Sequence, residues 1–162
     1  MEKKTHWKQL VNPDYIGAYA LAPNEEKTLT IKSVTREKVT GAGGKKQECT
    51  VIYFTENVKP MICNRTNAKT ITKVCGTPYI EEWSGKKIVL YVEAVDAFGE
   101  TVEALRVKPV VIDYELVNSY GEKLSNCNTQ EELNMLYEVS PKSETNKPEI
   151  RSLFTKRKNE IA

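Results

Sequence analysis

The spacing of apolar side chains predicts a series of short β-strands in the first two thirds of the chain. Residues 28–33 alternate between apolar and polar, with Leu29 and Ile31 on one side, which is typical of a half-buried strand. The alternation slips at Ser33, where we expect a β-bulge, and the strand then continues to Val39. Dense β-forming residues indicate four further strands, over residues 48–55, 61–63, 87–95 and 101–108.

One helix interrupts these strands. Apolar residues recur at helical spacing up to Cys75, with Thr66 or Asn67 as the expected N-cap and Gly76 as the C-terminal stop. The predicted fold class is therefore mainly β with α: a five-stranded Greek-key OB-fold barrel with a helix between strands 3 and 4. We expect this barrel over about residues 27–112, in a domain that spans residues 1–112 and includes an N-terminal extension.

The pattern changes after Ile112. Residues 113–125 are polar and irregular, and we interpret them as a linker. Thr129 and Glu132 have the spacing of a capping box, and Asn146 is the expected cap of a second helix. The fold class thus includes a C-terminal helical hairpin over residues 126–162, which is too small to be stable unless it packs on the barrel, on a second copy or on a partner.

The sequence contains no recognisable pattern of catalytic residues. His6 is the only histidine, and no second histidine could activate a cysteine nucleophile. The glycine-rich segment 41–44 lacks the Gly-Lys-Ser/Thr ending of a phosphate-binding loop and precedes a strand, so we interpret it as a hairpin loop. The four cysteines (49, 63, 75 and 127) lack the paired spacing of zinc ligands, and we expect buried free thiols. We predict no enzymatic activity, no metal and no cofactor.

The distribution of charge is more informative than its total of +2. Between Lys27 and Lys73 there are ten basic and three acidic residues, which gives this segment a net charge of +7. Such a segment favours a surface that faces a polyanion. A solvated lysine-rich face is the alternative.

Membrane insertion and secretion are not expected. No stretch approaches the ~20 apolar residues that a membrane-spanning helix needs. The basic residues near Met1 are not followed by the apolar segment of a secretory signal. We therefore expect a soluble, cytoplasmic protein.

A nucleic-acid site would combine basic loops with exposed aromatic rings. Single strands bind in cationic grooves, and their bases stack on aromatic side chains. In an OB barrel the binding face crosses strands 2 and 3 and is flanked by the loops between strands 1 and 2 and between strands 4 and 5. The first of these loops carries Lys38, Lys45 and Lys46, and the second carries Phe98.

Strand alternation indicates which other aromatic residues face outward. Tyr53 and Phe54 must lie on opposite faces; we expect Phe54 in the core and Tyr53 as a stacking platform, with the reverse assignment still open. Tyr91 differs in parity from Leu90 and is a second candidate. Hydrophobic packing is the alternative for each ring, and it is the preferred interpretation for Trp83. The predicted nucleic-acid-binding residues are Lys32, Arg36, Lys38, Lys45, Lys46, Tyr53, Lys59, Arg65, Tyr91 and Phe98.

Several segments resemble a family of small phage and prophage proteins. The most specific are Asn64-Arg-Thr-Asn67 and Trp83-Ser-Gly-Lys86; the others are Leu29–Val34, Tyr53–Phe54, Lys59–Cys63, Gly76 and Ala104–Val107, and together they cover roughly residues 5–110. Members of this family are usually taken to be OB-fold, single-stranded-DNA-binding-like factors of replication or recombination. They usually have leucine where this chain has Cys63, a conservative change in the core.

The resemblance implies non-enzymatic binding of single-stranded DNA in phage or prophage DNA replication and recombination, in the cytoplasm of a bacterial host. We expect weak sequence preference. We expect the C-terminal helices to contact either a second copy or replication and recombination proteins. The alternative is a structural or adaptor protein that uses the barrel for protein–protein contacts.

Overall fold

The chain folds into two compact units, divided between Val110 and Val111. The structure is a computed structural model, and it describes residue 5 and residues 14–162. His6, the only histidine of the sequence, lies outside the described residues.

The first unit contains the strands and the helix in the predicted order. Its elements are η1 (Ala18–Ala20), β1 (Lys27–Thr40), η2 (Ala42–Gly44), β2 (Lys46–Phe54), β3 (Met61–Cys63), α2 (Arg65–Cys75), η3 (Ile80–Trp83), β4 (Lys87–Ala97) and β5 (Glu100–Val107). The segment before β1 contains the turn of 3-10 helix η1.

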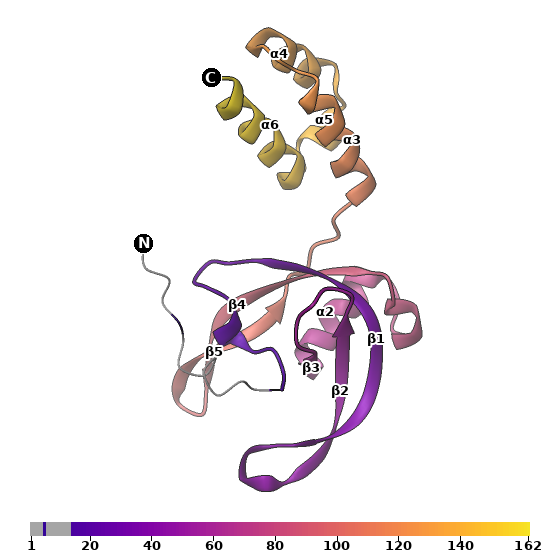
Figure 1. Ribbon diagram of the computed structural model, residues 1–162, viewed down its shortest axis with the longest axis vertical. Helices are drawn as coiled ribbons and strands as arrows, with labels where there is room; N and C mark the ends of the chain where they lie inside the picture. The colour runs from indigo at the N-terminus through magenta and orange to yellow at the C-terminus, as the bar shows by residue number, and fades with distance from the viewer. Residues whose placement is uncertain (1–4, 6–13) are drawn as a thin grey trace. The chain divides into compact units, whose positions relative to one another are not determined.

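The five strands form one antiparallel sheet in the order β3-β2-β1-β4-β5. β1 is long and curved, and it connects the two halves of the sheet (Figure 1). Its residues 27–30 pair with β4, and the rest of the strand, from Ile31 to Thr40, pairs with β2. The register shifts between Ile31 and Ser33, which confirms the bulge expected there.

The predicted closed barrel is not formed, because among the described residues β3 and β5 remain the two edges of an open sheet. β3 has only three residues, and the chain turns into α2 directly after it.

The N-cap of α2 is Asn64. Its side chain accepts a hydrogen bond from the backbone N–H of Asn67 at 2.9 Å, so the prediction of Thr66 or Asn67 as the N-cap is wrong.

Asn67 instead bonds to the free edge of β5. Its amide nitrogen donates to the carbonyl oxygen of Leu105 at 3.0 Å, and its amide oxygen accepts from the N–H of Val107 at 3.2 Å. These are the bonds that one residue of a neighbouring parallel strand would make with β5. Asn67 is only 2% exposed, so the two bonds replace water at backbone groups that would otherwise be buried without partners.

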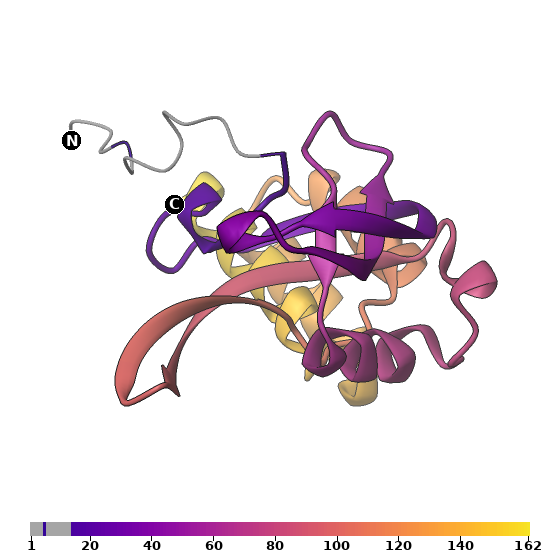
Figure 2. The same ribbon diagram turned by 90° about the horizontal axis from the view of Figure 1, so that it is seen from below.

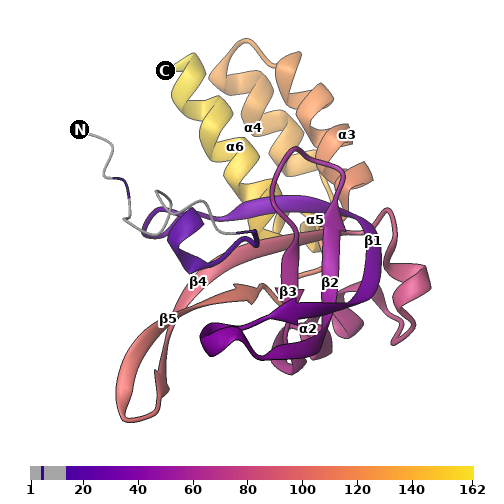
Figure 3. The same cartoon turned by 60° about the horizontal axis from the view of Figure 1, so that its bottom comes forward.

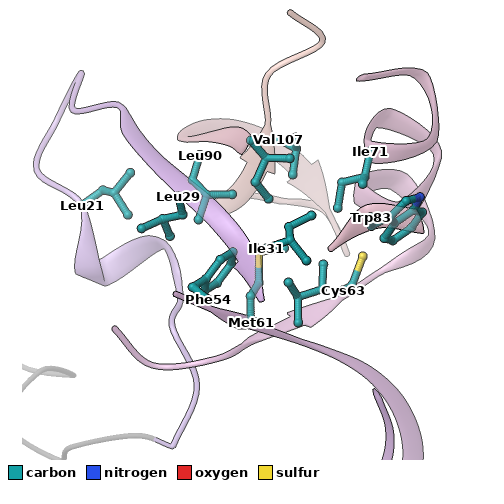
Figure 4. Close-up of a cluster of buried hydrophobic side chains, with 12 residues drawn as sticks. Leu21, Leu29, Ile31, Phe54, Met61, Cys63, Ile71, Trp83, Leu90 and Val107 are labelled. Atoms are coloured by element: carbon teal, nitrogen blue, oxygen red, sulfur yellow. The ribbon is translucent and has the colours of Figure 1, made fainter. Parts of the chain in front are cut away.

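The main core lies between the curved sheet and α2. Figure 4 shows its side chains, with Leu21 and Leu29 at one end and Ile71 and Trp83 at the other. Phe54 belongs to this cluster, which confirms the predicted core assignment. The Nε1–H of Trp83 donates to the carbonyl oxygen of Thr77 at 2.9 Å, so this tryptophan is a packing residue, as preferred from the sequence.

The second unit is a bundle of helices with its own core. Its elements are α3 (Tyr114–Ser125), α4 (Gln130–Val139), α5 (Lys142–Thr145) and α6 (Pro148–Ile161). The core consists of Tyr120, Leu124, Cys127, Leu133, Ile150 and Phe154. The capping box of α4 is confirmed, whereas α6 begins after Lys147 and not after the expected Asn146.

The predicted linker over residues 113–125 is wrong, because this segment forms α3. Asp113 caps the helix by accepting from the N–H of Leu116 at 3.0 Å. Tyr120 and Leu124 lie one turn apart and are buried against α6 and α4. The predicted hairpin of residues 126–162 is therefore completed by a further helix that supplies part of its core.

The cysteines form no disulfide in the described residues. Cys49, Cys63 and Cys127 are buried thiols, and burial raises the pKa of the Cys63 thiol to about 11. Cys75 is half-buried. The expectation of buried free thiols is therefore confirmed for three of the four.

No helix in the part of the chain that the structure describes is both long and apolar enough to cross a membrane.

Replacing Asn67 with alanine should lower the free energy of unfolding by about 2–4 kcal/mol, because the carbonyl of Leu105 and the N–H of Val107 both lose their partner in a buried site. Urea denaturation measures this change. The matched control is Asn57→Ala in an exposed turn, where we expect less than about 0.5 kcal/mol. Equal losses in the two variants would contradict the role of Asn67.

A chain that ends at Val110 should remain folded, because every residue of its main core and of the smaller cluster around Val51 precedes that point. Circular dichroism and the dispersion of the amide NMR signals measure this. A collapsed spectrum would show that the second unit is required for the first to fold.

Candidate nucleic-acid interface

The β1–β2 hairpin extends beyond the packed part of the sheet and carries most of the predicted cations (Figure 1). Arg36 pairs in register with Thr50, and Lys38 with Glu48. Paired residues of an antiparallel ladder share a face, so Arg36 and Lys38 continue the face that carries Phe54 in the core. We call this face the core face of the hairpin.

The tip of this hairpin brings two further lysines into solvent. Gly43 and Gly44 both have positive φ, 79° and 75°, which a residue with a Cβ rarely adopts. The N–H of Gly41 donates to the carbonyl oxygen of Lys45 at 2.8 Å and closes the loop. Lys45 and Lys46 follow directly and are exposed, so the segment is a hairpin loop, as predicted.

Tyr53 lies on the opposite face from these arginine and lysine side chains. It pairs with Ser33, next to the pair Thr35 and Val51, on the face that we call the outer face. A single stretch of nucleic acid lying on one face therefore cannot contact Tyr53 and Arg36 together. The bulge in β1 produces this separation, because it reverses the parity of every later residue of the strand.

The ring of Tyr53 is also partly engaged by the protein. It is half-buried and packs against a cluster formed by Val39, Cys49 and Val51, to which Tyr15 and Ile62 also contribute. Hydrophobic packing, the alternative interpretation of Tyr53, therefore describes part of what this ring does.

The hydroxyl of Tyr53 donates to Glu37 at 2.8 Å, and the hydroxyl of Thr35 donates to the same carboxylate oxygen at 2.6 Å. The bonds from Thr35 and then Tyr53 lower the pKa of Glu37, and the bond to Glu37 raises the pKa of Tyr53. Glu37 is therefore a stable negative charge on the outer face.

The two other predicted aromatic residues belong to the β4–β5 hairpin, which curves away from the rest of the sheet (Figures 2 and 3). Tyr91 is half-buried and pairs with Arg106. Phe98 is fully exposed at the tip, between the paired residues Ala97 and Glu100.

Phe98 is an unusual residue for its position in the turn. Phe98 and Gly99 both have positive φ, 55° and 80°, and the loop has two residues, which defines a type I′ turn. Asparagine and glycine favour these positions, whereas a bulky side chain such as phenylalanine is strained there. Phe98 neither packs on the core nor suits the turn, so its ring does not serve the fold.

The β4–β5 hairpin is acidic, which the sequence analysis missed. Over the paired residues 90–107, its carboxylates are Glu93, Asp96, Glu100 and Glu103, and the one cation is Arg106, whose Nε lies 3.4 Å from Glu93. A charge balance taken over each predicted hairpin, and not only over residues 27–73, would have found this difference.

The remaining predicted residues lie elsewhere in the first unit. Lys32 is exposed at the bulge of β1, Lys59 is half-buried before β3, and Arg65 is exposed in the first turn of α2. Lys69 and Lys73, which were not predicted, follow Arg65 on α2 at intervals of four residues, a spacing that could have identified them. The predicted set is therefore spread over two hairpins, the segment between β2 and β3, and one helix.

No cluster of three or more histidine, cysteine, aspartate or glutamate side chains that could hold a metal ion occurs among the described residues. No family model, curated protein or solved structure matches the chain.

Replacing Phe98 with asparagine should raise the free energy of unfolding by about 0.5–1 kcal/mol, because asparagine adopts positive φ more readily in a type I′ turn. Thermal or urea denaturation measures this gain. A loss of stability would mean that the exposed ring contributes to the fold.

Proposed function

We propose that this protein is a non-enzymatic, single-stranded-DNA-binding protein with weak sequence preference. The observation that carries the proposal is the β1–β2 hairpin, in which residues 32–48 include five basic and two acidic side chains. One cation, Arg36, is paired with Glu48 at 3.0 Å, and both side chains are more than half exposed, so this pair is weak. The hairpin can therefore exchange its counterions for phosphates.

The sheet order supports an OB-type architecture for this unit. The order β3-β2-β1-β4-β5 is that of an OB barrel opened between its third and fifth strands, and OB barrels are often only partly closed. The helix α2 also stands between β3 and β4, where an OB barrel has its helix. The β1–β2 and β4–β5 hairpins then correspond to the two loops that flank the binding face in that fold.

The resemblance to phage and prophage proteins suggests the setting. We propose that the protein acts in phage or prophage DNA replication or recombination, in the cytoplasm of a bacterial host. The second unit would then supply the contacts with another copy or with replication proteins, because it folds around a core of its own.

The β4–β5 hairpin favours a second candidate function, an adaptor that binds a basic protein. Its exposed Phe98 is flanked in the sequence by Asp96 and Glu100, whose charges repel a phosphate backbone and attract lysine and arginine. In this alternative the aromatic tip is an anchor for a protein and not a platform for a base.

Titration of a fluorescent single-stranded oligonucleotide at several salt concentrations tests the proposal. Affinity should fall with salt, and Lys45→Gln with Lys46→Gln should reduce the log–log slope by about 1.4, or 0.7 for each lost phosphate contact. The charge-matched control, Lys156→Gln with Lys158→Gln in α6, should leave the slope unchanged. Absence of binding by the unmodified protein at low salt would sink the proposal.

The Phe98→Asn variant separates the two functions in the same assay. If the ring stacks on a base, affinity for the oligonucleotide should fall by about 1–3 kcal/mol. If the affinity is unchanged, the acidic hairpin lies outside the DNA site, and the adaptor contact is its better interpretation.

A further inference from the structure

The helix α2 carries a row of cations along one side. Arg65, Lys69 and Lys73 follow one another at intervals of four residues, about 6 Å apart along the helix axis. All three are exposed, and α2 contains no acidic residue. Among the residues that the structure describes, no carboxylate lies within ion-pair distance of any of them. We call these three residues the α2 row.

The row faces away from the core because the other side of the helix is fixed. Asn67 and Ile71, the two buried residues of α2, are themselves four positions apart. At about 100° per residue they lie on the side of the helix opposite the α2 row. The bonds of Asn67 to β5 prevent the helix from rotating about its axis, so the row stays directed to solvent.

Only Lys73, in the last turn of α2, is placed favourably for the helix dipole. Like charges four residues apart repel one another, and a cation in the first turn opposes the helix dipole, as Arg65 does here. Bound anions would relieve both effects.

The register of the sheet connects this row to the β1–β2 hairpin. Arg36 pairs with Thr50, and Thr50 pairs with Cys63, the last residue of β3. Arg65 follows Cys63 by two residues. The core face of the hairpin, with Lys38 and Arg36, therefore leads across the three strands to the first turn of α2.

We infer that α2 is a second phosphate-binding element, along which a nucleic-acid strand continues after it leaves the β1–β2 hairpin. Its ligands are successive phosphates of the backbone, because the cations are evenly spaced at a distance comparable to that between neighbouring phosphates of an extended strand. This inference rests on the proposed function and extends it to Lys69 and Lys73.

The chemistry of the helix favours a nucleic acid over a membrane surface. An interfacial helix inserts an apolar face into lipid, and here the apolar face of α2 is buried in the core of its own unit. Between the cations the exposed side presents Thr66 and the half-buried Thr70, which suits a hydrated phosphate backbone.

The test compares two double variants with equal loss of charge. Lys69→Gln with Lys73→Gln removes two members of the α2 row, and Lys156→Gln with Lys158→Gln removes two exposed lysines of α6. With single-stranded oligonucleotides, the first variant should reduce the log–log salt slope by about 1.4, and the second should not change it. The α2 variant should also melt no lower than the unmodified protein, because glutamine favours helix and the repulsion is removed.

The outcomes are distinct. An unchanged slope for the α2 variant, in a protein that does bind, overturns the inference and leaves the proposed function intact. Equal reductions in both variants also overturn it, because the effect would then come from total charge. Failure of the unmodified protein to bind overturns the proposed function itself, and the inference with it.

A second measurement needs no variant. The bound oligonucleotide should protect Lys69 and Lys73 from acetylation, read by mass spectrometry, and should leave Lys156 and Lys158 reactive. Labelling of Lys69 and Lys73 at the same rate with and without the oligonucleotide would contradict the inference.

Discussion

The two hydrogen bonds between Asn67 and the edge of β5 are the contact on which the arrangement of the first unit depends. A three-residue β3 is too short to close the sheet, and the side-chain amide supplies the bonds that a closing strand would have made. The same contact holds α2 against the core, fixes the rotation of the helix and so directs its cations outward. One buried side chain therefore connects the stability of the sheet with the surface that we propose for phosphate binding.

The first unit separates its charges between two hairpins of one sheet. The β1–β2 hairpin is basic, and the β4–β5 hairpin is acidic and ends in an exposed aromatic ring. In the proposed function, an acidic hairpin in the same unit would repel a bound strand and so confine it to the basic hairpin. The total charge of the chain conceals this arrangement, because the two hairpins largely cancel.

Local patterns were sufficient to predict the local elements. Alternation identified β1 and its bulge, and the spacing of Thr129 and Glu132 identified the start of α4. The bonding of α2 to the edge of β5 could not be predicted in this way, because it depends on a side chain that bonds to a strand nearly 40 residues later. The separation of Tyr53 from Arg36 also required the register of two strands, because the expected bulge alone does not determine which residues of β1 and β2 are paired. The helix α3 was missed because its polar surface obscured the spacing of Leu116, Tyr120 and Leu124.

The division of the core between two units has a consequence for how tightly the protein would hold a strand in the proposed function. Each unit keeps its own buried cluster, so the second can engage a partner without unfolding or reshaping the first. A partner that binds the second units of several copies of the protein would bring one cationic hairpin from each copy to the same strand. Each later contact would then be intramolecular, and local concentration, more than the strength of any single site, would set the overall affinity.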